Sequence, residues 1–130
     1  MKIYDIEENL LAILIRSKDI VDGKNFITDN SNEFQLASFS LGENEVIERH
    51  HHPQQSRSIL NTSEVLVLLE GQMQIEIYDK KLELVEEIIL NTGDTIGFFG
   101  GGHGITLTRK CKFIEVKQGP FDELNDKKRF

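Results

Sequence analysis

The chain has 130 residues, 38% of them hydrophobic, and its 22 acidic and 15 basic side chains leave a net charge of −7. This length is typical of one domain with its own core, so we expect a single domain over residues 1–130. An acidic chain without a basic stripe argues against nucleic acid and membranes as partners, because binding to phosphate groups needs clustered Lys and Arg.

The first half of the chain is expected to hold two strands. The residues before the core are expected to form a short N-terminal strand region, with a short helical turn in the first dozen residues. Of the two strands, the first covers Phe34–Phe39 and ends at Gly42. The second strand is predicted to end at the run His50-His51-His52-Pro53.

From residue 64 onward, strands are expected at short intervals. Val65–Leu69 is a continuous apolar run, which is typical of a strand buried on both faces. After a turn at Gly71, apolar and polar residues alternate over Met73–Tyr78, which is the period of a half-buried strand. The remaining expected elements are strands over 82–90, 95–99, 105–108 and 111–116, with a short helical turn in the tail after Pro120. This pattern predicts an all-β protein with little helix, built as an antiparallel sandwich or barrel.

The single cysteine and the N-terminus indicate the compartment. Cys111 alone cannot form an intramolecular disulfide, and its place in a predicted strand favours a packed thiol over a nucleophile. Asp5, Glu7 and Glu8 precede the apolar residues Leu10–Ile15, where a signal peptide would need positive charge. No apolar stretch approaches the roughly 18 residues of a membrane span. We therefore expect a cytoplasmic protein.

All four histidines fall in two places, the run His50–His52 and a glycine-rich segment that contains His103. In an extended chain His50 and His52 point to one side and His51 to the other, so two imidazoles can approach one transition-metal ion. His103 is the natural third ligand, because neighbouring glycines let the backbone bring the ring close to a site. The alternative interpretation is a polar rim that binds no metal.

Strand parity leaves open which histidine faces inward. If Ile47 faces the core, His51 shares its side, unless a bulge before His50 shifts the register. We predict that His50 and His52 form the inward pair.

The first histidine segment resembles the first motif of the cupin family. In that motif His-x-His is followed by a Glu, then six residues and a Gly, and the matching positions here are His50, His52, Glu64 and Gly71. Eleven residues separate His52 from Glu64, where the family usually has three or four. The inserted residues 53–63 are expected either to form a lip over the barrel mouth or to give Glu64 a different role.

The second histidine segment is similar to the second cupin motif. Gly93, Asp94, Gly101 and His103 match it, although Phe99 replaces the usual Pro and His103 comes one residue early. The stretch from 115 to 120 resembles the end of a group of small, single-domain cupins that carry a Gly-Gly-His-Gly turn. The resemblance covers about residues 34–117 and implies that these residues form the core of a cupin fold, which is a double-stranded β-helix or jelly-roll barrel.

The resemblance also implies a bound ion. Cupins often hold one divalent transition metal, and by position its ligands here would be His50, His52, Glu64 and His103. The identity of the metal stays open among Zn, Fe, Ni and Mn. Cupins commonly pair through edge strands, so we expect a homodimer.

Three further residues are predicted to contact a small-molecule ligand. Arg57 lies in the inserted segment, and its guanidinium suits a carboxylate or phosphate, while Gln55 can supply neutral hydrogen bonds to a sugar-like ligand. Glu115 shares a strand face with Lys117 and is expected to line the mouth or to be exposed.

Three functions fit these features, two of them enzymatic and one a binding function. The first is a metal-dependent enzyme of the isomerase or epimerase type, acting on a small polar or carbohydrate-derived substrate. The alternatives are a non-catalytic small-molecule binding module and an Fe(II)-dependent dioxygenase. The cupin fold does not by itself decide among them.

Overall fold

The computed structural model describes residues 1–130, and the chain falls into two compact units. One unit consists of residues 1–17 and 61–130, and we call it the large unit. Residues 18–60 form the small unit. The expectation of one domain over residues 1–130 stays a prediction. No helix of the chain is long and apolar enough to cross a membrane.

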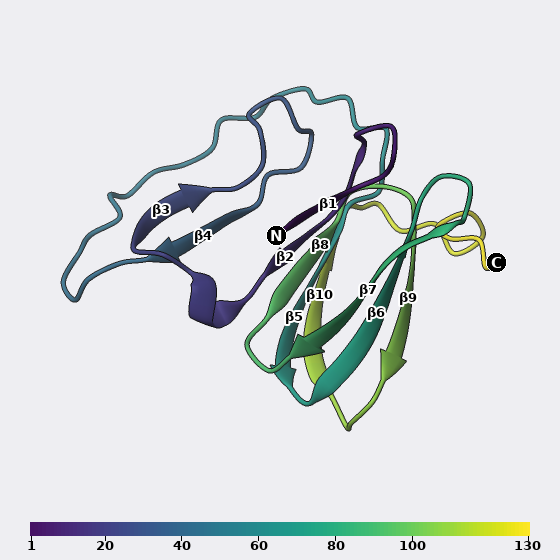
Figure 1. The fold of residues 1–130 in the computed structure, drawn as a ribbon. Coiled ribbons are helices and arrows are strands. Elements are labelled where there is room, and N and C mark those ends of the chain that lie inside the picture. Colours follow the sequence, from purple (N-terminus) through teal and green to yellow (C-terminus); the bar gives the residue numbers. More distant parts are fainter. The chain divides into compact units, whose positions relative to one another are not determined.

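The predicted all-β class with little helix is confirmed, and every strand pair is antiparallel (Figure 1). The large unit holds a five-stranded sheet in the order β1-β2-β8-β5-β10 and a three-stranded sheet in the order β7-β6-β9. The strands of the five-stranded sheet are β1 (Lys2–Tyr4), β2 (Leu10–Ile15), β8 (Thr95–Phe98), β5 (Glu64–Glu70) and β10 (Lys112–Lys117). The strands of the three-stranded sheet are β7 (Leu84–Asn91), β6 (Gln72–Tyr78) and β9 (Gly102–Leu107).

The small unit holds one strand pair, β3 (Gly23–Phe26) with β4 (Ala37–Ser40). A 3-10 turn at Ser17–Asp19 is the one helical element of the chain. The strand predicted over Phe34–Phe39 begins only at Ala37, as β4. Gln35 explains the delay, because its amide nitrogen donates hydrogen bonds to the carbonyls of Asp29 and Asn32 and thereby holds this segment in a loop.

Two other expectations about local structure are wrong. The helical turn expected in the first dozen residues is absent. These residues form β1 and the start of β2, within the region expected to hold a short strand, because the apolar residues from Leu11 to Leu14 are buried on both faces of the sheet. No strand lies between β4 and β5, so the run His50–His52 does not end a strand. The parity argument about which histidine faces inward therefore loses its basis. In the tail after Pro120, Asp126 N–H donates to the carbonyl of Asp122, which closes a single turn that is not assigned as a helix.

β5 is buried along one face, whereas its other face is buried at Val65 and exposed toward the end of the strand. Leu66 and Leu68 are fully buried, whereas Leu69 on the opposite face is 53% exposed. The fully buried residues belong to a core that draws on both sheets of the large unit, including Met73, Ile75 and Ile77 of β6. The inward face of the five-stranded sheet is therefore the face that carries Leu66.

Pairing register identifies the polar residues on this inward face. Glu64 at the start of β5 pairs with Phe98 of β8 on one side and with Lys117 of β10 on the other. Glu115 pairs with Leu66 in the same way. Because cross-strand partners share a face, one end of the inward face carries a cluster of charged side chains.

Candidate functional site

The carboxylate of Glu64 lies at the end of the inward face where the apolar core stops. Its side chain is 15% exposed, and its neighbours along the same face of β5 are the buried residues Leu66 and Leu68. Alternation along the strand accounts for this placement, since residues two apart share a face.

The imidazole of His103 reaches the same place from the other sheet. His103 lies on β9 opposite the buried Ile77 of β6, which fixes its side chain on the inward face of the three-stranded sheet. Its ring stacks on Phe98 with the centroids 4.0 Å apart and the planes within 13°. Stacking on a side chain buried in the core restricts how the imidazole can turn.

Glu64 and His103 face each other. The Oε1 atom of Glu64 lies 3.7 Å from the Nε2 atom of His103, which is too long for a direct hydrogen bond. The side chain of His103 is 30% exposed, so the pair lies at the border between core and solvent. Two residues that are 39 positions apart in the sequence, and that were both predicted as metal ligands, therefore come together.

Burial favours the neutral form of both groups. Burial raises the pKa of Glu64, and the nearby Glu115 raises it further. Burial lowers the pKa of His103, against an opposing influence from Glu115. The contact at 3.7 Å would be an ion pair only if His103 were protonated, and the lowered pKa disfavours that form at neutral pH. A neutral imidazole offers the Nε2 lone pair to a metal or to a hydrogen-bond donor.

Two further charged residues complete the large-unit cluster, and the sequence did not single them out together. The ammonium group of Lys117 lies 2.5 Å from the carboxylate of Asp126, with side chains that are 18% and 9% exposed. Asp126 belongs to the C-terminal tail, so only the folded chain reveals its partner. Glu115, predicted as a ligand contact, is exposed on the same face of β10.

The other two predicted metal ligands lie in the small unit. The rings of His50 and His52 are neighbours, with centroids 5.2 Å apart and planes at 84°. The Nδ1 atom of His50 lies 2.9 Å from the carbonyl oxygen of Glu48, which can only accept, so Nδ1 is the donor in this contact and Nε2 is the ring atom free for another partner. The pairing of His50 with His52 is therefore a feature of the fold even without a strand.

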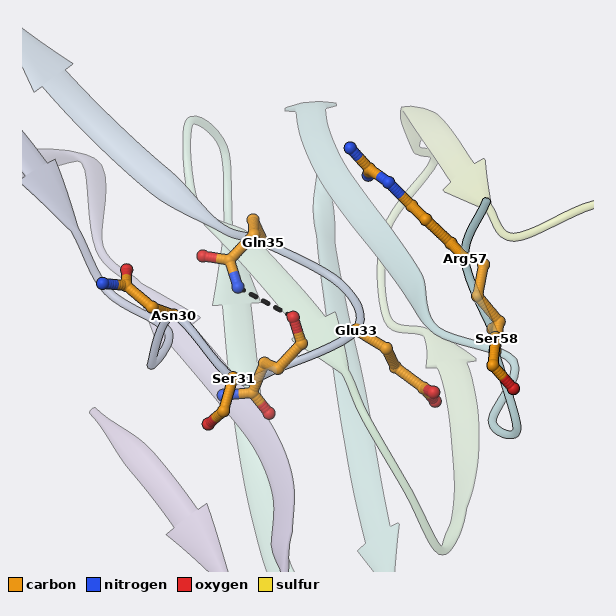
Figure 2. A pocket seen from close by; sticks show the side chains of 8 residues that line it. Asn30, Ser31, Glu33, Gln35, Arg57 and Ser58 are labelled. Atoms are coloured by element: carbon orange, nitrogen blue, oxygen red, sulfur yellow. Dashed lines mark hydrogen bonds between the residues drawn. The ribbon is translucent and has the colours of Figure 1, made fainter. Parts of the chain in front are cut away.

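The small unit also has a cavity of about 400 Å³ that Arg57 helps to line. Its other lining side chains are mostly polar and include Asn30, Ser31, Glu33 and Gln35. Figure 2 shows Glu33 between the Arg57–Ser58 segment and the side chains of Asn30, Ser31 and Gln35. Arg57 therefore lies beside a hollow of the size that takes a small polar molecule.

Gln55, the other predicted ligand residue of the inserted segment, is exposed and is not among the residues that line this cavity. Its predicted role stays untested. The loop residues Asn30, Ser31, Glu33 and Gln35 had no sequence signal, because polar loops look alike whether or not they surround a cavity.

Within either unit, no three His, Cys, Asp or Glu side chains gather closely enough to hold a metal ion by themselves. Glu64 with His103 in the large unit, and His50 with His52 in the small unit, are the two pairs that the predicted ligand set forms. The set of four ligands stays a prediction.

Comparisons with protein families, with curated proteins and with solved structures find no match for this chain.

Proposed function

We propose that this chain is a cupin-type protein that binds one divalent transition metal through Glu64 and His103. We further propose that it acts on a small polar or carbohydrate-derived substrate by isomerase or epimerase chemistry. The observation that supports this proposal is the approach of Glu64 Oε1 to His103 Nε2, at 3.7 Å from two different sheets.

The separation of these two atoms fits a shared ion. Ligand atoms at 2.0–2.2 Å from a tetrahedral Zn²⁺ lie roughly 3.3 to 3.6 Å from one another. A separation of 3.7 Å is close to this range, so a small inward movement would bring both atoms into coordination. Carboxylate oxygen and imidazole nitrogen are also donors that Zn, Fe, Ni and Mn accept. His50 and His52 remain the predicted further ligands.

The surroundings of the pair suit chemistry beside a carbonyl group. A bound metal would supply Lewis acidity to polarise that carbonyl. Glu115 shares the inward face and brings a carboxylate that can take a proton from the neighbouring carbon. Phe98 holds the His103 ring and excludes water from one face of it.

A non-catalytic binding module is the second candidate. The cavity beside Arg57 favours it, because its lining combines the Arg57 guanidinium and the Glu33 carboxylate with neutral amides and hydroxyls, which can hold a small hydroxylated ligand by hydrogen bonds without any reaction.

Metal content, measured by elemental analysis of tag-free protein, tests the first part of the proposal. We expect about one transition metal per chain in the parent and loss of that metal in His103→Ala and His52→Ala. His51→Ala is the matched control, since His51 is not among the predicted ligands, and it should keep the metal. Iron would favour the dioxygenase, whereas zinc, nickel or manganese would favour the Lewis-acid role. A parent protein that stays free of metal after supplementation would overturn the metal proposal.

Proton exchange tests the second part. We would incubate the metal-loaded protein with keto sugars and sugar phosphates in D₂O and follow deuterium incorporation beside the carbonyl by NMR. Incorporation that is lost in Glu115→Gln supports isomerase or epimerase chemistry. Binding of the same compounds without any incorporation would favour the binding module.

A further inference from the structure

The C-terminal residues 118–130, which we call the strap, are fastened to the large unit near Glu64. Lys117, the residue before the strap, is the cross-strand partner of Glu64. Its ammonium group pairs with Asp126 of the strap at 2.5 Å and lies 4.9 Å from the ring centre of Phe121. Both charged side chains of the pair are mostly buried, so this fastening is not a loose surface contact.

The far end of the strap is fastened near His103. The ring of Phe130 meets the ring of Tyr78 edge-on, with the centroids 5.1 Å apart. It also lies directly over Gly102, the residue before His103, where an added Cβ would come within 2.8 Å of the Phe130 ring. In Figure 1 the yellow tail runs from the end of β10 toward the ends of β6 and β9.

The strap is therefore fastened once beside each member of the Glu64–His103 pair. One fastening is beside Glu64 on the five-stranded sheet and the other is beside His103 on the three-stranded sheet. Lys127 lies between Asp126 and Phe130 in the sequence of the strap, and its positive charge lowers the pKa of both Glu64 and His103.

We propose that the strap covers the Glu64–His103 site and controls access to it, with the Lys117–Asp126 ion pair as its latch. When the strap lifts, Lys117 loses its carboxylate partner and becomes available to a carboxylate or phosphate group of an incoming ligand. The covering of His103 is independent of any metal, whereas the control of ligand entry rests on the proposed function.

Chemical modification of His103 tests the covering. The full-length chain, treated with a chelator, is exposed to diethyl pyrocarbonate, and the rate of modification at each histidine is measured by peptide mass spectrometry. We expect Asp126→Asn and Phe130→Ala to raise the rate at His103 at least about fivefold, because each removes one fastening. Glu123→Gln is the matched control, since it makes the same change of charge at an exposed strap residue that has no partner. The exposed His51, which is not among the predicted ligands, serves as the internal reference whose rate should stay constant.

Unchanged modification of His103 in both strap variants would overturn the proposal, whether or not the protein binds metal. For the metal-loaded protein, the rate at which EDTA removes zinc is a second measurement. It should rise severalfold in the same two variants and stay constant in Glu123→Gln. If the parent binds no metal but His103 is modified faster in the two strap variants, the covering of His103 by the strap is supported and only the proposed function is refuted.

Discussion

Arg16 and Asp94 form an ion pair between residues that are 78 positions apart, with Nη1 of Arg16 2.6 Å from Oδ2 of Asp94. The buried carboxylate also accepts hydrogen bonds from the backbone N–H groups of Ser17 and Asn91. It therefore joins the end of β2 to the turn between β7 and β8. β8 pairs with both β2 and β5, and β5 carries Glu64 of the candidate site.

Replacing this carboxylate should be costly. We expect Asp94→Ala to lower the free energy of unfolding by about 2–4 kcal/mol, because it leaves Arg16 and two backbone donors without their acceptor. Urea denaturation followed by circular dichroism measures the change. The control is Glu70→Gln, which breaks the exposed pair with Lys112 and should cost less than about 0.5 kcal/mol. Equal effects of the two variants would refute the role of Asp94.

The glycine-rich turn before His103 requires glycine at one particular position. Gly101 has a φ of +67°, and a Cβ there would lie 2.0 Å from the carbonyl oxygen of Tyr78. We expect Gly101→Ala to destabilise the protein by about 2–4 kcal/mol and to displace His103. A Cβ at the neighbouring Gly100 would meet only an ordinary contact of 3.5 Å, so Gly100→Ala is the control. The midpoint of thermal unfolding, measured for both variants, checks the prediction. Equal midpoints would show that glycine is not required at position 101.

The lowered pKa of His103 should make the metal-free protein sensitive to mild acid. The pKa of the unfolded side chain is about 6.5, so as the pH falls below this value the unfolded state takes up the proton first. The free energy of unfolding then falls until the pH passes the lower pKa of the folded state. Between pH 8 and pH 5, His103→Gln should therefore lose less stability than the parent, as measured by urea denaturation in the presence of a chelator. His51→Gln, at an exposed position, should follow the parent, and a parallel His103→Gln curve would contradict the prediction.

The raised pKa of Glu64 should make the metal-free protein less stable as the pH rises, which is opposite to the effect of His103. Burial keeps the folded carboxyl protonated to a higher pH than the unfolded one, so ionisation costs stability once the pH exceeds the unfolded pKa of about 4.5. Without metal, Glu64→Gln should be more stable than the parent at pH 7, and the difference should vanish below about pH 4. With saturating zinc the order should reverse, because the parent gains metal-binding energy that the variant lacks. Differential scanning calorimetry with and without zinc checks both parts, and an unchanged order would count against Glu64 as a ligand.

The stacking of Phe98 on His103 should matter more for metal binding than for folding. We expect Phe98→Leu to lower the free energy of unfolding by about 1–1.5 kcal/mol and to weaken zinc binding roughly tenfold, because the imidazole loses its orientation. Phe113→Leu, at an exposed residue of β10, is the control. Competition with a chelating dye measures the affinity, and equal affinities of the two variants would show that the stacking does not position His103.

Much of the fold could be predicted from local patterns. Alternation over Met73–Tyr78 predicted β6, and the apolar run Val65–Leu69 predicted β5, because side chains of a strand alternate between two faces. The same local patterns failed at residues 1–12 and at the run His50–His52. Whether a short segment forms a strand there depends on partners that are far away in the sequence.

For the candidate site, the sequence by itself supplied the chemistry: two histidine segments and a carboxylate with the donor types that a transition metal accepts. Only the tertiary structure decided that Glu64 and His103 approach to 3.7 Å, that Phe98 stacks on the imidazole, and that Asp126 pairs with Lys117. These relationships depend on strand register and on the path of the tail. Register is set by the packing of a whole sheet on its core, so no short stretch of sequence contains it.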